Sequence, residues 1–216
     1  VREPTKRAIS QFFHFEVSRE GTPTTDHDFQ KYLRNERGYL RNYYLQVLNP
    51  EKTNAALVDL DPTTLINKIM YDYDFIGITE RMGETAVCLM MLLGVPMGSM
   101  LYLDAKTNGG YDDAGHDHTC HYIQPSHVSS GMEFFFQHRS WKSLVRWDEI
   151  LYDAANRSLD LTIDRLGRAE FERNLATFRH AQAVAGDRCL PREVFPCTSN
   201  GALNPNKQCL WKDSAC

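Results

Sequence analysis

The sequence predicts an α/β fold in which helices flank the strands of a parallel sheet. Residues 75–79 (FIGIT) and 100–106 (MLYLDAK) are short, largely apolar segments that predict two strands. Segments with apolar residues at helical spacing lie before, between and after them, and this alternation is typical of a parallel sheet. Because two strands are few for an independent sheet, we expect the sheet to be incomplete in this chain, with further strands upstream of Val1.

The chain before residue 75 is expected to form three helices. The first begins at Pro4, because proline suits the first helical position and apolar residues follow it at helical spacing. The second covers residues 29–40. The third follows Asp61, which suits the cap position, and it has Pro62 in its first turn.

Further helices are predicted on both sides of a long polar loop. Thr79 and Glu80 open a helix that is apolar nearly all round and is therefore expected to be buried, and Gly94 with Pro96 ends it. The last third of the chain is predicted to be helical, with its final helix over residues 168–184. The helix before that one has a single apolar stripe, made by Leu144, Trp147, Leu151, Ala155, Leu159 and Ile163.

Length and composition limit the class of protein. The chain has 216 residues, of which 42% are hydrophobic and 24% are charged, enough for one sizeable core. We expect one domain over residues 1–187 and a separate tail over 188–216. The net charge of −4 argues against a nucleic-acid partner, which usually calls for a basic excess, but it is compatible with a small anionic ligand. No window holds the roughly 18 consecutive apolar residues of a membrane span.

The tail is expected to be held by disulfides. Four of the six cysteines lie in the last 28 residues, in a segment rich in proline and asparagine that cannot bury much core. A zinc site is the alternative, although no C-x2-C pair is present. The sequon at Asn156 agrees with a secretory compartment. The four cysteines of the tail are Cys189, Cys197, Cys209 and Cys216.

The first ten residues, VREPTKRAIS, resemble the 3′-phosphate-binding segment of sulfotransferases that use 3′-phosphoadenosine 5′-phosphosulfate (PAPS). In that family a strand ends in an arginine, an acidic–proline pair opens a helix, and a serine follows eight positions after the arginine. The matching residues here are Arg2, Glu3, Pro4 and Ser10, with a second arginine, Arg7, before the serine. The resemblance implies that Arg2 and Ser10 bind the 3′-phosphate.

Three further segments resemble Golgi carbohydrate sulfotransferases of the heparan sulfate 2-O- and galactose-3-O-types. Residues 75–94 are similar to their strand–Glu–helix block, and residues 148–167 to their final amphipathic helix. Residues 106–113 (KTNGGYDD) resemble a loop that folds over the cofactor in the 2-O-type enzymes. The resemblance covers residues 1 to about 185. It implies a P-loop-kinase-like parallel sheet flanked by helices, with C-terminal helices after it.

The chemistry of the matched residues suits an anion. The planar guanidinium of Arg2 can bind two phosphate oxygens at once, and the Ser10 hydroxyl can add a donor. The helix that begins at Pro4 is expected to point unpaired N–H groups and its positive dipole end toward the same phosphate. The alternative is that Arg2 pairs with a surface carboxylate and that Ser10 is an ordinary polar helix residue.

The loop residues Lys106 and Thr107 are implied as further cofactor-binding residues. Lys106 could neutralise charge on the sulfonate or phosphate, or it could be a solvated loop lysine. Thr79 and Glu80 are interpreted as a helix cap and its dipole partner rather than as ligands.

A histidine-rich loop offers a metal site as an alternative use of the same region. His116, His118 and His121 could converge on one ion, with Cys120 or Asp117 beside them. Their spacing matches no helical or finger pattern, and sulfuryl transfer from PAPS needs no metal, so we expect none. Cys120 could instead pair with Cys88, the other cysteine outside the tail.

The predicted function is transfer of a sulfuryl group from PAPS to a hydroxyl of a carbohydrate acceptor, a glycan or proteoglycan. The family's 5′-phosphosulfate loop and its catalytic base precede the arginine motif, so we expect both upstream of Val1 and expect these 216 residues alone to be inactive. The resemblance implies the Golgi lumen, as part of a type II membrane protein anchored outside this chain, or secretion.

Two other functions remain open. The first is a secreted α/β glycan-binding module, an inactive relative without catalysis. The second is a fragment of a nucleoside or nucleotide kinase, although the chain has no G-x-x-x-x-G-K-[ST] motif.

Overall fold

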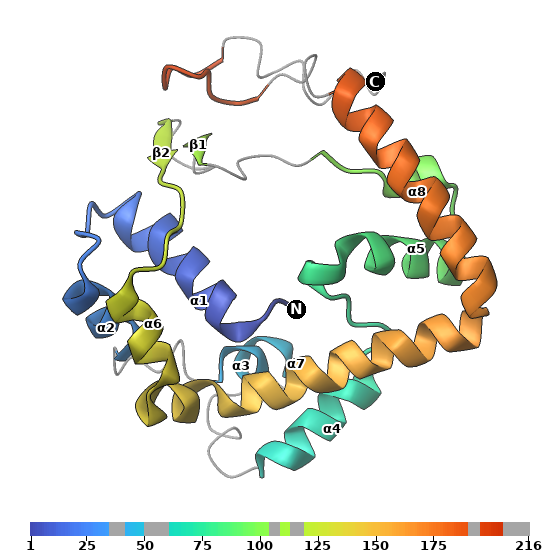
Figure 1. Cartoon of the computed structure of the whole chain (residues 1–216), viewed down its shortest axis with the longest axis horizontal. Helices are drawn as coiled ribbons and strands as arrows, with labels where there is room; N and C mark the ends of the chain where they lie inside the picture. The colour runs from blue at the N-terminus through green and yellow to red at the C-terminus, as the bar shows by residue number, and fades with distance from the viewer. Residues whose placement is uncertain (35–41, 50–60, 104–108, 113–118, 190–194, 205–216) are drawn as a thin grey trace.

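The computed structural model describes residues 1–34, 42–49, 61–103, 109–112, 119–189 and 195–204. This part of the chain is mostly helical and contains one two-stranded antiparallel sheet (Figure 1). The α-helices are α1 (Pro4–Gln11), α2 (Asp26–Arg34), α3 (Tyr43–Leu48), α4 (Pro62–Asp72), α5 (Met82–Leu93), α6 (Ser130–Gln137), α7 (Arg139–Leu166) and α8 (Arg168–Cys189). The other elements are the π-helix η1 (Phe12–Val17), the 3-10 helices η2 (Thr79–Arg81) and η3 (Met97–Met100), and the strands β1 (Gly110–Asp112) and β2 (His121–Ile123).

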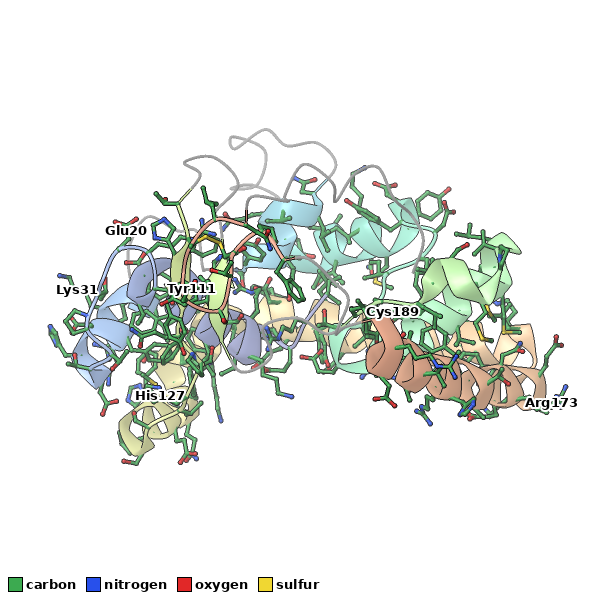
Figure 2. The ribbon with its side chains drawn as sticks, turned by 90° about the horizontal axis from the view of Figure 1, so that it is seen from above. Glu20, Lys31, Tyr111, His127, Arg173 and Cys189 are labelled. Carbon is green, nitrogen blue, oxygen red and sulfur yellow. A yellow bond between two sulfur atoms is a disulfide. The ribbon has the colours of Figure 1, made fainter. Side chains whose placement is uncertain are left out.

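The long helix α7 organises the molecule. It contacts α1, α3, α4, α5, α6 and α8, and it runs along one side of the structure in Figure 1. Helices α1, α2 and α6 gather near its N-terminal end, and α5 and α8 lie near its C-terminal end. In Figure 2, Lys31 of α2 and Arg173 of α8 accordingly lie at opposite ends of the molecule.

Three apolar clusters form along α7. The first joins α1, η1, α2 and α6 around Phe12 and Phe29. The second joins α3 and α4 to the middle of α7 around Ile69 and Leu151. The third joins α5, α8 and the end of α7 around Val87. One helix can serve all three clusters because its buried residues recur every three or four positions; they are Trp141, Val145, Asp148, Leu151, Ala155, Leu159 and Ile163.

The helix termini confirm several predictions. The carboxylate of Asp61 accepts a hydrogen bond from the Thr64 amide at 3.0 Å and caps α4. Helix α5 ends at Gly94, whose φ of 63° lies in the left-handed region, which residues with a side chain rarely adopt. The predicted stripe of α7 is also confirmed at Leu151, Ala155, Leu159 and Ile163, while Leu144 and Trp147 are only partly buried.

The parallel sheet that the sequence predicts is not seen in the described residues. The only sheet in the described residues pairs β1 with β2, in the region that the sequence predicts as a loop, and it is antiparallel. Residues 101–103 form no strand, and residues 75–78 are not assigned to a sheet, although Ile78 has extended backbone angles. A strand needs a paired neighbour to satisfy its amides and carbonyls. Among the described residues, the segment 75–78 is paired only with Val1, as described below. Local sequence signals were enough to predict most of the helices. They could not predict how strands pair, because strand partners lie far apart in the sequence.

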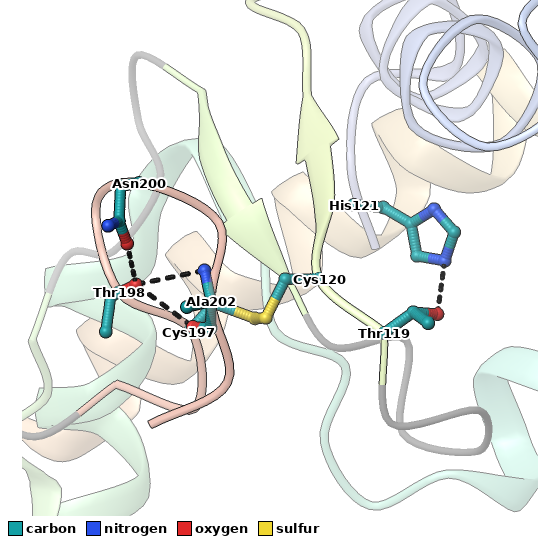
Figure 3. The surroundings of a disulfide bond; sticks show 7 residues. All are labelled: Thr119, Cys120, His121, Cys197, Thr198, Asn200 and Ala202. Atoms are coloured by element: carbon teal, nitrogen blue, oxygen red, sulfur yellow. Dashed lines mark hydrogen bonds between the residues drawn. A yellow bond between two sulfur atoms is a disulfide. The ribbon is translucent and has the colours of Figure 1, made fainter. Parts of the chain in front are cut away.

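The cysteine predictions are partly confirmed. A disulfide joins Cys120, just before β2, to Cys197 in the tail, with the two Cα atoms 5.9 Å apart (Figure 3). The tail is therefore cross-linked, but to the β1–β2 hairpin. The suggested pair of Cys120 with Cys88 is wrong, because Cys88 is a buried free thiol on α5. Cys189 is also a free thiol, while Cys209 and Cys216 lie outside the described residues.

Within the described ranges, none of the helices combines the length and apolar character that crossing a membrane requires.

Candidate functional site

The backbone at the start of the chain is paired with residues just before α5. The Val1 nitrogen donates to the Gly77 carbonyl at 2.6 Å, and the Thr79 amide donates to the Val1 carbonyl at 2.8 Å. In parallel extended segments, the amide and carbonyl of one residue bond to the two residues on either side of its partner, as seen here. Val1 is thus in register with Ile78, and both segments run directly into helices.

Arg2 leaves this pairing with a partly exposed side chain. The side chain is 41% exposed, and its Nε lies 4.0 Å from Oε1 of Glu80, at the outer limit of an ion pair. Such a pair contributes at most about 1 kcal/mol in solvent, so an incoming dianion could replace Glu80 at this guanidinium. The structure therefore places Arg2 beside a carboxylate, as the alternative interpretation of the motif expects, while leaving its side chain accessible.

Glu80 makes contacts that its predicted role at a helix start does not require. Its Oε1 accepts a hydrogen bond from the Glu3 amide at 3.0 Å, and its Oε2 accepts one from the Tyr152 hydroxyl at 3.2 Å. Together with burial, the nearby Glu80 carboxylate raises the pKa of Tyr152 to about 12. Glu80 therefore connects the start of α1 to α7, a role that its position in the sequence did not indicate.

The N-terminus of α1 differs from the expectation. The Glu3 carboxylate accepts hydrogen bonds from the amides of Thr5 at 2.9 Å and Lys6 at 2.7 Å. These amides are therefore not unpaired, because an acidic residue at the cap position satisfies them and complements the helix dipole.

Ser10 is partly buried in the second half of α1. It follows Glu3 by seven residues, which places it on nearly the same face of the helix and about 10 Å further along the axis. Ser10 therefore lies two turns beyond the N-terminus of α1, on nearly the same face as Glu3. Lys106 and Thr107, the other two predicted ligands, lie outside the described residues.

The second arginine of the motif is buried rather than presented to a ligand. The Arg7 guanidinium lies 4.1 Å from the Tyr43 ring centroid and 5.5 Å from that of Tyr44. One of its nitrogens is 3.9 Å from Oδ2 of Asp148, and another donates to Gln11 at 2.6 Å. Arg7 therefore connects α1 to α3 and α7.

Asp148 is a buried residue that the sequence interpretation missed. Its Oδ1 accepts the Tyr44 amide at 2.9 Å, at the start of α3, and no part of its side chain is exposed. Burial raises the pKa of Asp148 to about 6, against the opposing effects of Arg7 and of amide hydrogen bonds from α3. The sequence does contain an indication of this buried site. Asp148 falls on the apolar stripe of α7, where a charged side chain needs a buried partner.

A hollow of about 260 Å³ lies beside Glu80, between the start of α5 and α8. Tyr102 and Phe178 lie along it with ring centroids 6.4 Å apart, and Gln182 is hydrogen-bonded to the Tyr102 backbone. Arg81, on its rim, is held by Glu84, Asn156 and Asp160. The amide oxygen of the Asn156 sequon is therefore bound within the middle of α7.

The metal alternative gains no support from the residues that the structure describes, which contain no group of three or more His, Cys, Asp or Glu side chains placed to hold an ion. His121 is described, and its Nε2 lies 3.0 Å from the Thr119 hydroxyl (Figure 3). His116, Asp117 and His118 lie outside the described residues.

Comparisons of the chain with models of protein families, with curated proteins and with solved structures found no match.

Proposed function

We propose that this chain is part of a PAPS-dependent sulfotransferase domain that moves a sulfuryl group to a hydroxyl of a carbohydrate acceptor. The observation that carries the proposal is the pairing of Val1 with Gly77 and Thr79. It brings the two firmest segments of the sequence resemblance, residues 1–10 and 75–94, into adjacent positions. The proposal requires these two segments to be neighbours, and the pairing supports it on that point.

In this proposal the two paired segments are the carboxyl ends of neighbouring strands in a parallel sheet. Each is followed by a helix, α1 or α5, as in an α/β fold. Open α/β sheets bind their ligands beyond the carboxyl ends of the strands. Arg2 lies at that edge, with a partly exposed side chain.

The proposed chemistry assigns the 3′-phosphate of the nucleotide to Arg2, which would exchange its long contact with Glu80 for two hydrogen bonds to phosphate oxygens. Ser10 would contribute a hydroxyl, and Lys106 and Thr107 would cover the cofactor. The acceptor oxygen attacks sulfur in line, and cations stabilise the charge on the transferring group. A luminal Golgi or secreted location belongs to the same proposal.

The test is nucleotide binding by the full-length protein, measured by isothermal titration calorimetry. Adenosine 3′,5′-bisphosphate should bind, and Arg2→Lys, which keeps the charge but loses the planar fork, should weaken it roughly 10- to 100-fold. Arg173→Lys, a change at an exposed position at one end of the molecule, is the control and should have no effect. Unchanged affinity in Arg2→Lys would contradict the assignment.

The competing functions give different results in the same series. A glycan-binding module without catalysis would bind glycans equally well in the wild type and in Arg2→Lys, and would not transfer labelled sulfate from PAPS. A kinase fragment would be stabilised by ATP rather than by PAPS in a thermal-shift comparison.

A further inference from the structure

The Arg2 peptide is held from two sides. Its amide donates to the Tyr44 hydroxyl at 2.7 Å, and the same hydroxyl donates to the Arg2 carbonyl at 2.6 Å. Successive residues of an extended segment present their amides and carbonyls to opposite sides. Val1 therefore uses the side facing Gly77 and Thr79, and Arg2 uses the side facing Tyr44. A single phenol takes the place of a neighbouring strand at this residue.

Tyr44 is itself firmly placed. It is 6% exposed, and its amide donates to the buried Asp148 carboxylate at 2.9 Å. The Asn42 amide, just before α3, donates to the Leu144 carbonyl of α7 at 3.1 Å. Burial raises the pKa of Tyr44 to about 12, so its hydroxyl keeps the proton that it donates to Arg2. The longest helix of the described chain thus fixes the position of this hydroxyl.

We propose that Tyr44 is the positioning residue that holds the Arg2 peptide so that its guanidinium meets the 3′-phosphate of the nucleotide in a two-oxygen geometry. This inference rests on the proposed function. A planar guanidinium binds two phosphate oxygens only when two of its N–H groups point at them. If the backbone of Arg2 is fixed before the ligand binds, less conformational entropy is lost on binding. Tyr44 acts through Arg2 and does not itself touch the ligand.

The experiment compares two nucleotides on the full-length protein. Calorimetry gives the dissociation constants of adenosine 3′,5′-bisphosphate and adenosine 5′-monophosphate, whose ratio reports the contribution of the 3′-phosphate. Tyr44→Phe should lower this ratio about tenfold, with the monophosphate affinity unchanged, because only the placement of Arg2 is disturbed. Tyr43→Phe, which removes the neighbouring hydroxyl but keeps the ring over Arg7, should leave the ratio unchanged.

The other outcomes overturn the inference. An unchanged ratio in Tyr44→Phe would show that Arg2 needs no such support. An equal loss of affinity for both nucleotides, with a lower Tm, would mean that the hydroxyl only stabilises the fold. If the wild-type protein binds both nucleotides equally or neither, the proposed function fails first, and the role of Tyr44 fails with it.

A measurement on the wild-type protein covers the case in which Tyr44→Phe does not fold. Amide hydrogen exchange followed by NMR should show the Arg2 amide protected before any nucleotide is added, because it is already bonded to Tyr44. Rapid exchange of this amide in the ligand-free protein, slowed only by the bisphosphate, would show that the ligand rather than Tyr44 orders Arg2.

Discussion

Replacing Asp148 by asparagine should remove a pH dependence from the stability of this protein. Burial raises the pKa of Asp148 from its usual 3.8 to about 6, so the native protein holds this proton at pH values where the unfolded chain has released it. The resulting stabilisation is fully present below pH 3.8 and is lost as the pH rises through 6. At about 1.4 kcal/mol for each pH unit between the two pKa values, the loss is on the order of 3 kcal/mol.

Asparagine carries no titrating proton, so Asp148→Asn lacks this component of the pH dependence. Urea unfolding of both proteins between pH 4 and pH 7.5 gives the difference in their free energies of unfolding. That difference should shift in favour of the variant by on the order of 3 kcal/mol as the pH rises. The native pKa of about 6 already includes the interaction of Asp148 with Arg7, so the loss of this pair in the variant is part of the same trend.

Asp153→Asn, which alters an exposed carboxylate on the same helix, is the matched control and should not reproduce the shift. A difference between wild type and Asp148→Asn that stays constant across this range would refute the reasoning. It would show that Arg7 and the amides of α3 compensate fully for the burial of the charge.

Two further predictions concern stability. Replacing Cys120 and Cys197 by serine should lower the free energy of unfolding by roughly 2–4 kcal/mol, because the disulfide joins residues 77 apart and so closes a long loop. Under reducing conditions the same double change should make no difference. Denaturant titration measures the free energy of unfolding in both cases. Gly131→Ala should destabilise the protein by about 1–3 kcal/mol, since the added methyl would collide with the Asp26 carboxylate that holds Ser129. Gly98→Ala, at a site with open space around it, is the control for the second prediction, and equal Tm values for the two alanine variants would contradict it.

The candidate site could be predicted from the sequence only in part. The motif VREPTKRAIS identified Arg2 as an accessible cation at the entrance of a helix, and the structure agrees. It did not predict that Glu3 would occupy the first amides of α1, or that Arg7 would be buried against Tyr43. A motif states which residues are present, whereas their accessibility depends on the elements packed around them.

The sequence by itself determined where several helices begin and end. Pro4 after Glu3, Pro62 after Asp61, and Gly94 act within one turn of chain, because a cap needs only its own side chain and the nearest amides.

Only the tertiary structure decided the pairing of Val1 with Gly77 and Thr79, the disulfide between Cys120 and Cys197, and the two hydrogen bonds between Tyr44 and Arg2. Each joins residues that are far apart in the sequence, as the separations of 42, 76 and 77 show. Local periodicity cannot indicate such partners, because they are brought together by the packing of distant segments in the folded protein.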